Sequence, residues 1–203
     1  MTEINSLTET DRYEDSQNDH AGKLHTNRRK ITGNNIILIG MPASGKSSVG
    51  VILAKILGKG FVDTDLVIQQ KENALLREII ANEGIDGFLK CEENAVLSIH
   101  PNNSVIATGG SVIYSEKAME YLAGSGIIVY LYVKKEDLFT RLRNIQQRGV
   151  ILKDGESLDE MYNSRSVLYE KYADVIINEQ DLSLENTVQF IVKELQKSNS
   201  PSS

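Results

Sequence analysis

Residues 35–50 read NIILIGMPASGKSSVG, and this stretch decides the fold. Ile36 to Ile39 form a short, continuous apolar run, which is typical of a strand buried on both faces. After the glycine-rich part, apolar residues recur at i, i+3, i+4, i+7 and i+8, the spacing of one face of a helix. The residues of this face are Val49, Ile52, Leu53, Ile56 and Leu57.

Between the strand and the helix, Gly40 to Ser47 fits G-x-x-x-x-G-K-[ST] without a mismatch. Glycines allow the backbone to wrap a phosphate, and the loop amides and the helix N-terminus direct partial positive charge at it. A glycine-rich turn without a ligand is the alternative, but the complete motif with both flanking elements argues against it. The predicted nucleotide-binding residues of the loop are Gly40, Ala43, Ser44, Gly45, Lys46, Ser47 and Ser48.

The last two residues of this motif, Lys46 and Ser47, each have a predicted chemical role. Lys46 adds a full positive charge that can reach the β- and γ-phosphates of a nucleotide, so we expect it to be catalytic. Ser47 offers its hydroxyl to Mg²⁺. The predicted cofactors are therefore ATP and Mg²⁺.

Two carboxylates follow the first helix in the stretch from Phe61 to Asp65, which we interpret as a short strand ending in Asp63 and Asp65. Residues i and i+2 of a strand share a face, so both acids could face the phosphate loop. One could hold Mg²⁺ through water, and the other could orient or deprotonate a hydroxyl. The alternative is that an aspartate only caps the following helix, a role Asp65 could also take.

The rest of the chain alternates helices and strands, which predicts an α/β fold with a mainly parallel central sheet and helices on both faces. We expect helices within 66–99, broken near Gly84 and Gly87, and a polar lid over 144–156. Further strands are expected at 104–108, 127–133 and 174–177, and further helices at 115–123, 135–143, 157–172 and 184–195.

Composition excludes several classes of function. The net charge of −6 does not favour nucleic-acid binding, and no apolar run is long enough to span a membrane. With Cys91 as the only cysteine, expected on a helix as a small buried residue, the sequence predicts a cytoplasmic protein without an internal disulfide. We expect a disordered tail over 1–33, a kinase domain over 34–197 and a frayed tail over 198–203.

Taken together, residues 34–195 resemble the shikimate kinase family. The resemblance rests on an ordered set of motifs: the loop Gly40–Ser47, Asp63-Thr64-Asp65, Gly84 with Phe88 and Glu92-Glu93, Ala107-Thr108-Gly109-Gly110, Arg148, and Arg165 followed by Leu168-Tyr169 and Ala173-Asp174. It implies a P-loop fold like that of the nucleoside monophosphate kinases, and phosphorylation of shikimate to shikimate 3-phosphate by a monomer.

The resemblance also implies roles for individual residues. Asp63 resembles the acid near the metal, and Asp65 the carboxylate that grips substrate hydroxyls and acts as base. Gly109 and Gly110 resemble the backbone donors to the substrate, and Arg165 resembles an arginine that binds the substrate carboxylate. Two further arginines resemble nucleotide-side residues: Arg148, the catalytic lid arginine that closes over ATP, and Arg141.

Three departures from the family pattern lie on the substrate side and in the lid. The usual Phe-Arg pair is Phe88-Leu89, the third glycine is Ser111, and the lid pair Arg-Pro is Arg148-Gly149. Leu89 removes one of two arginines expected at the acceptor carboxylate, so a different polyol or hydroxy acid is an alternative substrate. A nucleotide-binding paralogue without turnover is another alternative. A nucleoside monophosphate kinase is disfavoured, because Arg77 is the sole arginine in 66–100.

Overall fold

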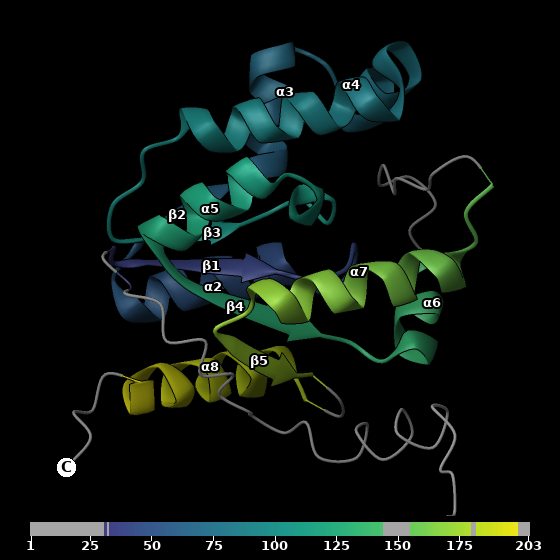
Figure 1. Ribbon diagram of the computed structural model, residues 1–203. Coiled ribbons are helices and arrows are strands. Elements are labelled where there is room, and N and C mark those ends of the chain that lie inside the picture. The colour runs from purple at the N-terminus through teal and green to yellow at the C-terminus, as the bar shows by residue number, and fades with distance from the viewer. Residues whose placement is uncertain (1–30, 32, 144–154, 180–181, 199–203) are drawn as a thin grey trace, which may run out of the picture.

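The computed structural model of the chain describes residues 31, 33–143, 155–179 and 182–198 (Figure 1). Within these residues the strands are β1 (Asn35–Ile39), β2 (Gly60–Asp63), β3 (Ser104–Ala107), β4 (Gly126–Tyr132) and β5 (Val175–Asn178). The helices are α2 (Lys46–Leu57), α3 (Thr64–Glu72), α4 (Leu76–Ser98), α5 (Glu116–Ser125), α6 (Lys135–Arg143), α7 (Leu158–Tyr172) and α8 (Leu184–Ser198), with a short 3₁₀ helix, η1 (Val112–Tyr114). Arg148, Gly149 and most of the predicted lid and of both predicted tails lie outside the described residues.

The five strands form one sheet in the order β2-β3-β1-β4-β5, and every neighbouring pair is parallel. This confirms the predicted α/β fold. β1 lies in the middle of the sheet, and all five of its residues are buried. The carboxyl ends of β1, β2 and β3 therefore meet at one edge, where parallel α/β sheets bind their ligands.

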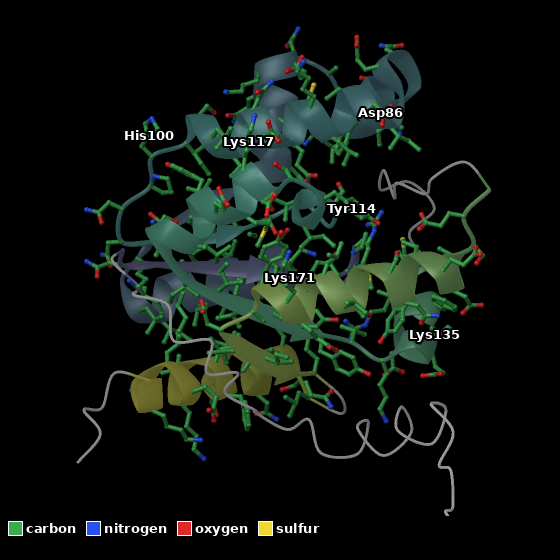
Figure 2. All side chains as sticks on the ribbon, viewed as in Figure 1. Asp86, His100, Tyr114, Lys117, Lys135 and Lys171 are labelled. Carbon is green, nitrogen blue, oxygen red and sulfur yellow. The ribbon has the colours of Figure 1, made fainter. Side chains whose placement is uncertain are left out.

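Alternate residues of β1 reach the two faces of the sheet, and each face carries its own apolar core. Ile37 and Ile39 pack in a cluster with residues of α5 and α7, such as Met119 and Tyr169. Ile36 belongs to a second cluster, which residues of α2 and α8 complete. Helices thus cover both faces of the sheet, as Figure 1 shows, and Figure 2 adds the side chains in the same view.

A third, smaller cluster joins α3 and α4, which lie beyond the sheet edge formed by β2 (Figure 1). Its buried residues are Ile68 of α3 and Ile79, Phe88 and Ala95 of α4. Because α3 follows β2 directly, this cluster fixes the α3–α4 pair close to the carboxyl ends of the strands, where ligands are expected to bind.

Four local predictions are wrong. Ile56 was expected on the buried face of α2 but is 58% exposed. The buried face includes Gly50 and Ala54 instead, and the small size of these two residues lets the helix approach the sheet. A Cβ at Gly50 would lie 2.7 Å from Cε2 of Phe61. Gly87 is helical, whereas α4 is kinked at Gly84, where φ is 68°.

The other two differences concern single side chains or element limits. Cys91 lies on α4 as predicted but is half-buried rather than buried. α3 begins immediately after β2, so Asp65 belongs to a helix and not to the strand. In the part of the chain that the structure describes, no helix is long and apolar enough to cross a membrane.

Candidate active site

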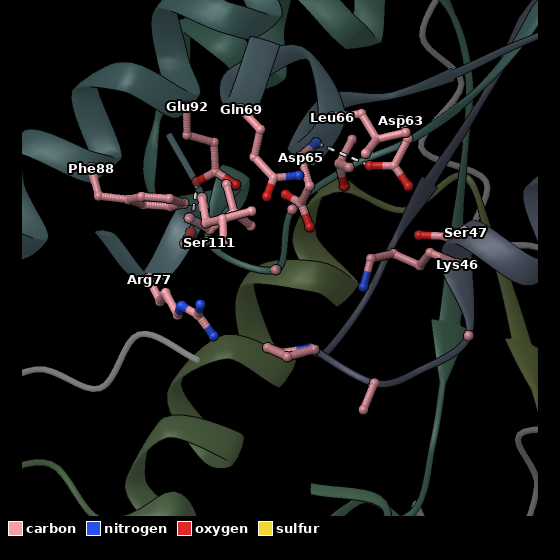
Figure 3. Close-up of a pocket in the computed structure, with 18 of the residues that line it drawn as sticks. Lys46, Ser47, Asp63, Asp65, Leu66, Gln69, Arg77, Phe88, Glu92 and Ser111 are labelled. Carbon is pink, nitrogen blue, oxygen red and sulfur yellow. Dashed lines mark hydrogen bonds between the residues drawn. The ribbon is translucent and has the colours of Figure 1, made fainter. Parts of the chain in front are cut away.

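A cavity of about 480 Å³ opens at the carboxyl ends of β1, β2 and β3. Figure 3 shows Lys46, Ser47 and Asp63 toward one end of it and Phe88, Glu92 and Ser111 toward the other. The residues predicted from the sequence that line this cavity are Ala43, Gly45, Lys46, Ser47, Ser48, Asp63, Asp65, Gly109, Gly110 and Arg165. Segments far apart in the sequence therefore meet around one space.

The loop after β1 is organised around the ammonium group of Lys46. Its Nζ donates hydrogen bonds to the carbonyl oxygens of Gly40 at 2.8 Å and Met41 at 2.7 Å, and to Oγ of Ser44 at 3.3 Å. Gly40 and Ser44 thus support the loop from within, although they do not line the cavity. The side chain of Lys46 is held where the sequence motif predicts a phosphate.

The backbone of the loop needs its glycines. Gly40 has φ of 148° and Gly45 has φ of 87°, a region that residues with a Cβ rarely occupy. A Cβ at Gly40 would also lie 2.7 Å from the carbonyl oxygen of Leu131. Because α2 begins directly after Gly45 and has no side-chain cap, its first amides remain for an anion. The loop therefore fits a nucleotide phosphate.

Burial lowers the pKa of Lys46 from its ordinary value to about 8. The carboxylates of Asp65, Glu179, Asp63 and Glu92 oppose this effect, in decreasing order. A bound phosphate would add negative charge beside the ammonium group and so favour its protonated form. The site is thus built to hold Lys46 charged when an anion occupies the loop.

The two aspartates approach the loop from the end of β2. Asp63 is the N-cap of α3, and its Oδ1 accepts a hydrogen bond from the amide of Asp65 at 3.0 Å. The cap is therefore Asp63 rather than Asp65, and Asp65 stands in the first turn of the helix. Both carboxylates line the cavity together with the hydroxyl of Ser47. These oxygen donors fit Mg²⁺, which prefers such ligands.

The glycines after β3 allow two acidic side chains to lie against the backbone. A Cβ at Gly109 would lie 2.0 Å from Oε1 of Glu92 and 2.9 Å from Oδ1 of Asp65. The amide of Gly109 donates to Oγ1 of Thr64 at 3.0 Å, so it already has an intramolecular partner. The amide of Gly110 makes no hydrogen bond with another described residue, which leaves it as the better placed of the two predicted donors.

Arg165 is buried, with only 1% of its surface exposed, yet it lines the cavity. Its Nε donates to the hydroxyl of Tyr114 at 3.2 Å, and its guanidinium carbon lies 5.3 Å from the centre of the Tyr114 ring. Tyr169, which donates to the carbonyl oxygen of Gly110 at 2.6 Å, stands beside it on α7. The aromatic neighbours fix the guanidinium, so little entropy is lost when it binds an anion.

Glu92 is a residue of the site to which the sequence analysis assigned no role. It lines the cavity at 1% exposure, and its Oε2 accepts a hydrogen bond from Oγ of Ser111 at 2.6 Å. Its Oε1 has no hydrogen-bond partner among the residues that the structure describes. Ser111, one of the departures from the family pattern, thus uses its added hydroxyl to hold this carboxyl group.

Burial raises the pKa of Glu92 from 4.5 to about 7, and the hydrogen bond from Ser111 partly opposes this shift. The folded protein therefore keeps a proton that the unfolded chain releases near pH 4.5. We expect the free energy of unfolding to fall as the pH rises from about 4.5 to about 7, by about 3 kcal/mol relative to the Glu92→Gln variant. Urea unfolding of both proteins across this pH range measures the difference.

The Ser111→Ala substitution tests the bond to Glu92. Without the hydroxyl, the pKa of Glu92 is expected to rise above 7, so the decline in unfolding free energy should extend to higher pH. Ser125→Ala is the matched control, because that hydroxyl donates to a backbone carbonyl oxygen, at 2.9 Å, and touches no carboxylate. If the decline in unfolding free energy ended at the same pH in Ser111→Ala as in the wild type, the bond would not stabilise the charged form of Glu92.

Arg141 does not line the cavity, but it lies beside the phosphate loop. Its Nη1 donates to the carbonyl oxygen of Ala43 at 3.5 Å and to Oε2 of Glu179 at 3.2 Å. Glu179 is buried after β5, and burial raises its pKa, opposed by its bond to Arg141. Arg141, the second arginine predicted on the nucleotide side, is thus anchored to the phosphate loop and to the segment after β5.

A parallel sheet of order β2-β3-β1-β4-β5, with a lysine-bearing phosphate loop after its central strand, is the framework of P-loop kinases that resemble the nucleoside monophosphate kinases. The chain is a member of this class.

Comparison with known proteins identifies the family. The profile of the family "Shikimate kinase" matches residues 42–196. A shikimate kinase from Thermodesulfovibrio yellowstonii is 36% identical over 166 residues, which cover 80% of this chain and 95% of the relative. The chain belongs to the shikimate kinase family.

Solved structures agree with this assignment. A shikimate kinase from Acinetobacter baumannii, in complex with shikimate, has a TM-score of 0.75 and 31% identity, covering 84% of this chain and 97% of that one. A shikimate kinase from Aquifex aeolicus has a TM-score of 0.71 and 27% identity over 83% of this chain and 99% of that one.

Proposed function

We propose that this chain transfers the γ-phosphoryl group of ATP to a ring hydroxyl of shikimate, giving shikimate 3-phosphate and ADP. The observation that carries this proposal is the similarity over nearly the whole described domain to shikimate kinases, one of them solved with shikimate. The cavity supports it, because one space is lined by the phosphate-loop lysine, a carboxylate that can receive a proton, and a buried arginine.

On the acceptor side, Asp65 is placed to act on the attacking hydroxyl. Its carboxylate lies against Gly109, at the carboxyl end of β3, and faces the same cavity as Lys46. It would orient the hydroxyl and receive its proton as the oxygen attacks phosphorus. The amide of Gly110 and the guanidinium of Arg165 would fix the rest of the acceptor in position.

On the nucleotide side, the amides that follow Gly45 would bind the phosphates, and Lys46 would neutralise the charge that builds on the transferred group. Ser47 and Asp63 would hold Mg²⁺, Asp63 through water. Mg²⁺ bound by these residues would offset the negative charge of the phosphates. Arg148 of the predicted lid is proposed to close over ATP and, like Lys46, to be catalytic.

The test is ADP release by the purified full-length protein with MgATP, measured with and without shikimate. We expect strong shikimate-dependent release, with the background set by ATP hydrolysis alone. Background-level release in a protein that binds MgATP would contradict the proposal. A panel of polyols and hydroxy acids would then separate another acceptor, the alternative that Leu89 suggests, from a nucleotide-binding protein without turnover.

A further inference from the structure

Among the described residues that line the cavity, two carry guanidinium groups, Arg165 of α7 and Arg77 of α4. Arg77 is exposed, and Figure 3 shows it at the same end of the cavity as Phe88, Glu92 and Ser111, away from Lys46. This is the end at which the acceptor is expected to bind. The family resemblance assigns no role to Arg77.

The kink in α4 brings Arg77 to this cavity. At Gly84 the helix turns with φ of 68° and ψ of −174°. Residues before the kink, including Leu76 and Arg77, therefore line the same space as Phe88 and Glu92 beyond it. A straight helix would carry its first turn away from the residues that lie three turns further on.

The stability of α4 does not explain the charge of Arg77. The residues three and four positions away are Asn73, Ala74, Ile80 and Ala81, so no carboxylate stands at the spacing of a helical ion pair. A cation near the first turn of a helix also opposes the helix dipole. Arg77 makes no hydrogen bond or ion pair with another described residue.

The charges at the acceptor end of the cavity favour a second cation beside Arg165. When Glu92 is ionised, above its pKa of about 7, its carboxylate balances part of the positive charge of Arg165. Leu89, at the position where the family pattern has an arginine, does not line the cavity and packs against the apolar α3–α4 cluster instead. A second positive charge at this end would therefore strengthen the binding of an anionic acceptor.

We propose that Arg77 is a specificity-determining residue that binds the carboxylate of the acceptor together with Arg165. It would take the role of the arginine that the family pattern has at the position of Leu89. This inference rests on the proposed function. The planar guanidinium group matches a carboxylate with two parallel hydrogen bonds, and an arginine on the exposed rim can close onto a ligand after it enters.

The test compares two acceptors in matched variants of the full-length protein. Arg77→Leu is expected to lower kcat/KM for shikimate by about 10- to 100-fold, the loss typical of a hydrogen bond to a charged group. It should leave the KM for ATP unchanged, and it should barely affect the methyl ester of shikimate, which has no carboxylate charge. Lys90→Leu, which removes an exposed cation from the same helix, is expected to change neither acceptor.

A second variant keeps the inference falsifiable. Adding Leu89→Arg to Arg77→Leu should restore much of the lost discrimination between shikimate and its ester, because a guanidinium would return at the position where the family pattern has an arginine. Thermal unfolding of each variant checks that it is folded. If wild type uses shikimate and Arg77→Leu behaves like Lys90→Leu on both acceptors, the role of Arg77 is refuted while the proposed function stands. If the wild-type protein itself does not use shikimate, the proposed function is refuted, and the role of Arg77 that rests on it is refuted as well.

Discussion

Replacing Lys46 with Met is expected to lower kcat for shikimate-dependent ADP release by about 10³-fold, the scale of losing a charge that stabilises the transferred phosphoryl group. Methionine keeps the length and apolar stem of the side chain but removes the ammonium group. That group is held in the phosphate loop by the carbonyl oxygens of Gly40 and Met41 at 2.8 Å and 2.7 Å.

The measurement is turnover at saturating MgATP and shikimate, together with calorimetric binding of shikimate alone. Lys55→Met is the matched control, because Lys55 is an exposed lysine of the same helix. We expect full activity in the control and unchanged shikimate binding in Lys46→Met. Activity within a few-fold of wild type in Lys46→Met would contradict the role proposed for the loop.

Replacing Asp65 with Asn is expected to lower kcat by about 10²- to 10⁴-fold, the range typical of losing a positioned general base. The amide has nearly the shape of the carboxylate, so α3 should remain intact, but it cannot receive the proton of the attacking hydroxyl. Its carboxylate also lies against Gly109, so binding of shikimate should weaken as well. Initial rates at varied shikimate, at fixed MgATP, measure both effects.

Asp63→Asn is the informative comparison for this variant. Its side-chain oxygen can still accept the hydrogen bond from the amide of Asp65, which keeps the cap of α3. We expect the main effect of Asp63→Asn to be a higher Mg²⁺ concentration for half-maximal activity, with the KM for shikimate little changed. Identical kinetic profiles in the two variants would show that the aspartates do not divide the metal and acceptor roles as proposed.

Local patterns carry much of the fold. Some elements depend only on residues close together in the sequence, and such elements can be predicted from it. They include the apolar run of β1, the glycines of the phosphate loop, and the N-terminal caps of α5 and α7, Ser115 and Ser157. The prediction of Ile56 on the buried face was wrong because apolar spacing alone does not say which neighbour a helix meets. Gly50 and Ala54 set that contact by their small size.

In the candidate site, too, some features follow from the local sequence and others depend on tertiary contacts. The sequence by itself predicted the phosphate loop and the pair of aspartates, since each belongs to a motif of fixed local spacing, and the family resemblance added Arg165. Only the tertiary structure decided that Glu92 is buried, that one of its oxygens has no partner in the described part of the chain, that Ser111 holds the other, and that Arg77 reaches the cavity. The physical reason is that burial, hydrogen bonding and charge balance depend on segments from different strands and helices, and the kink at Gly84 and the register of β3 set where those segments meet.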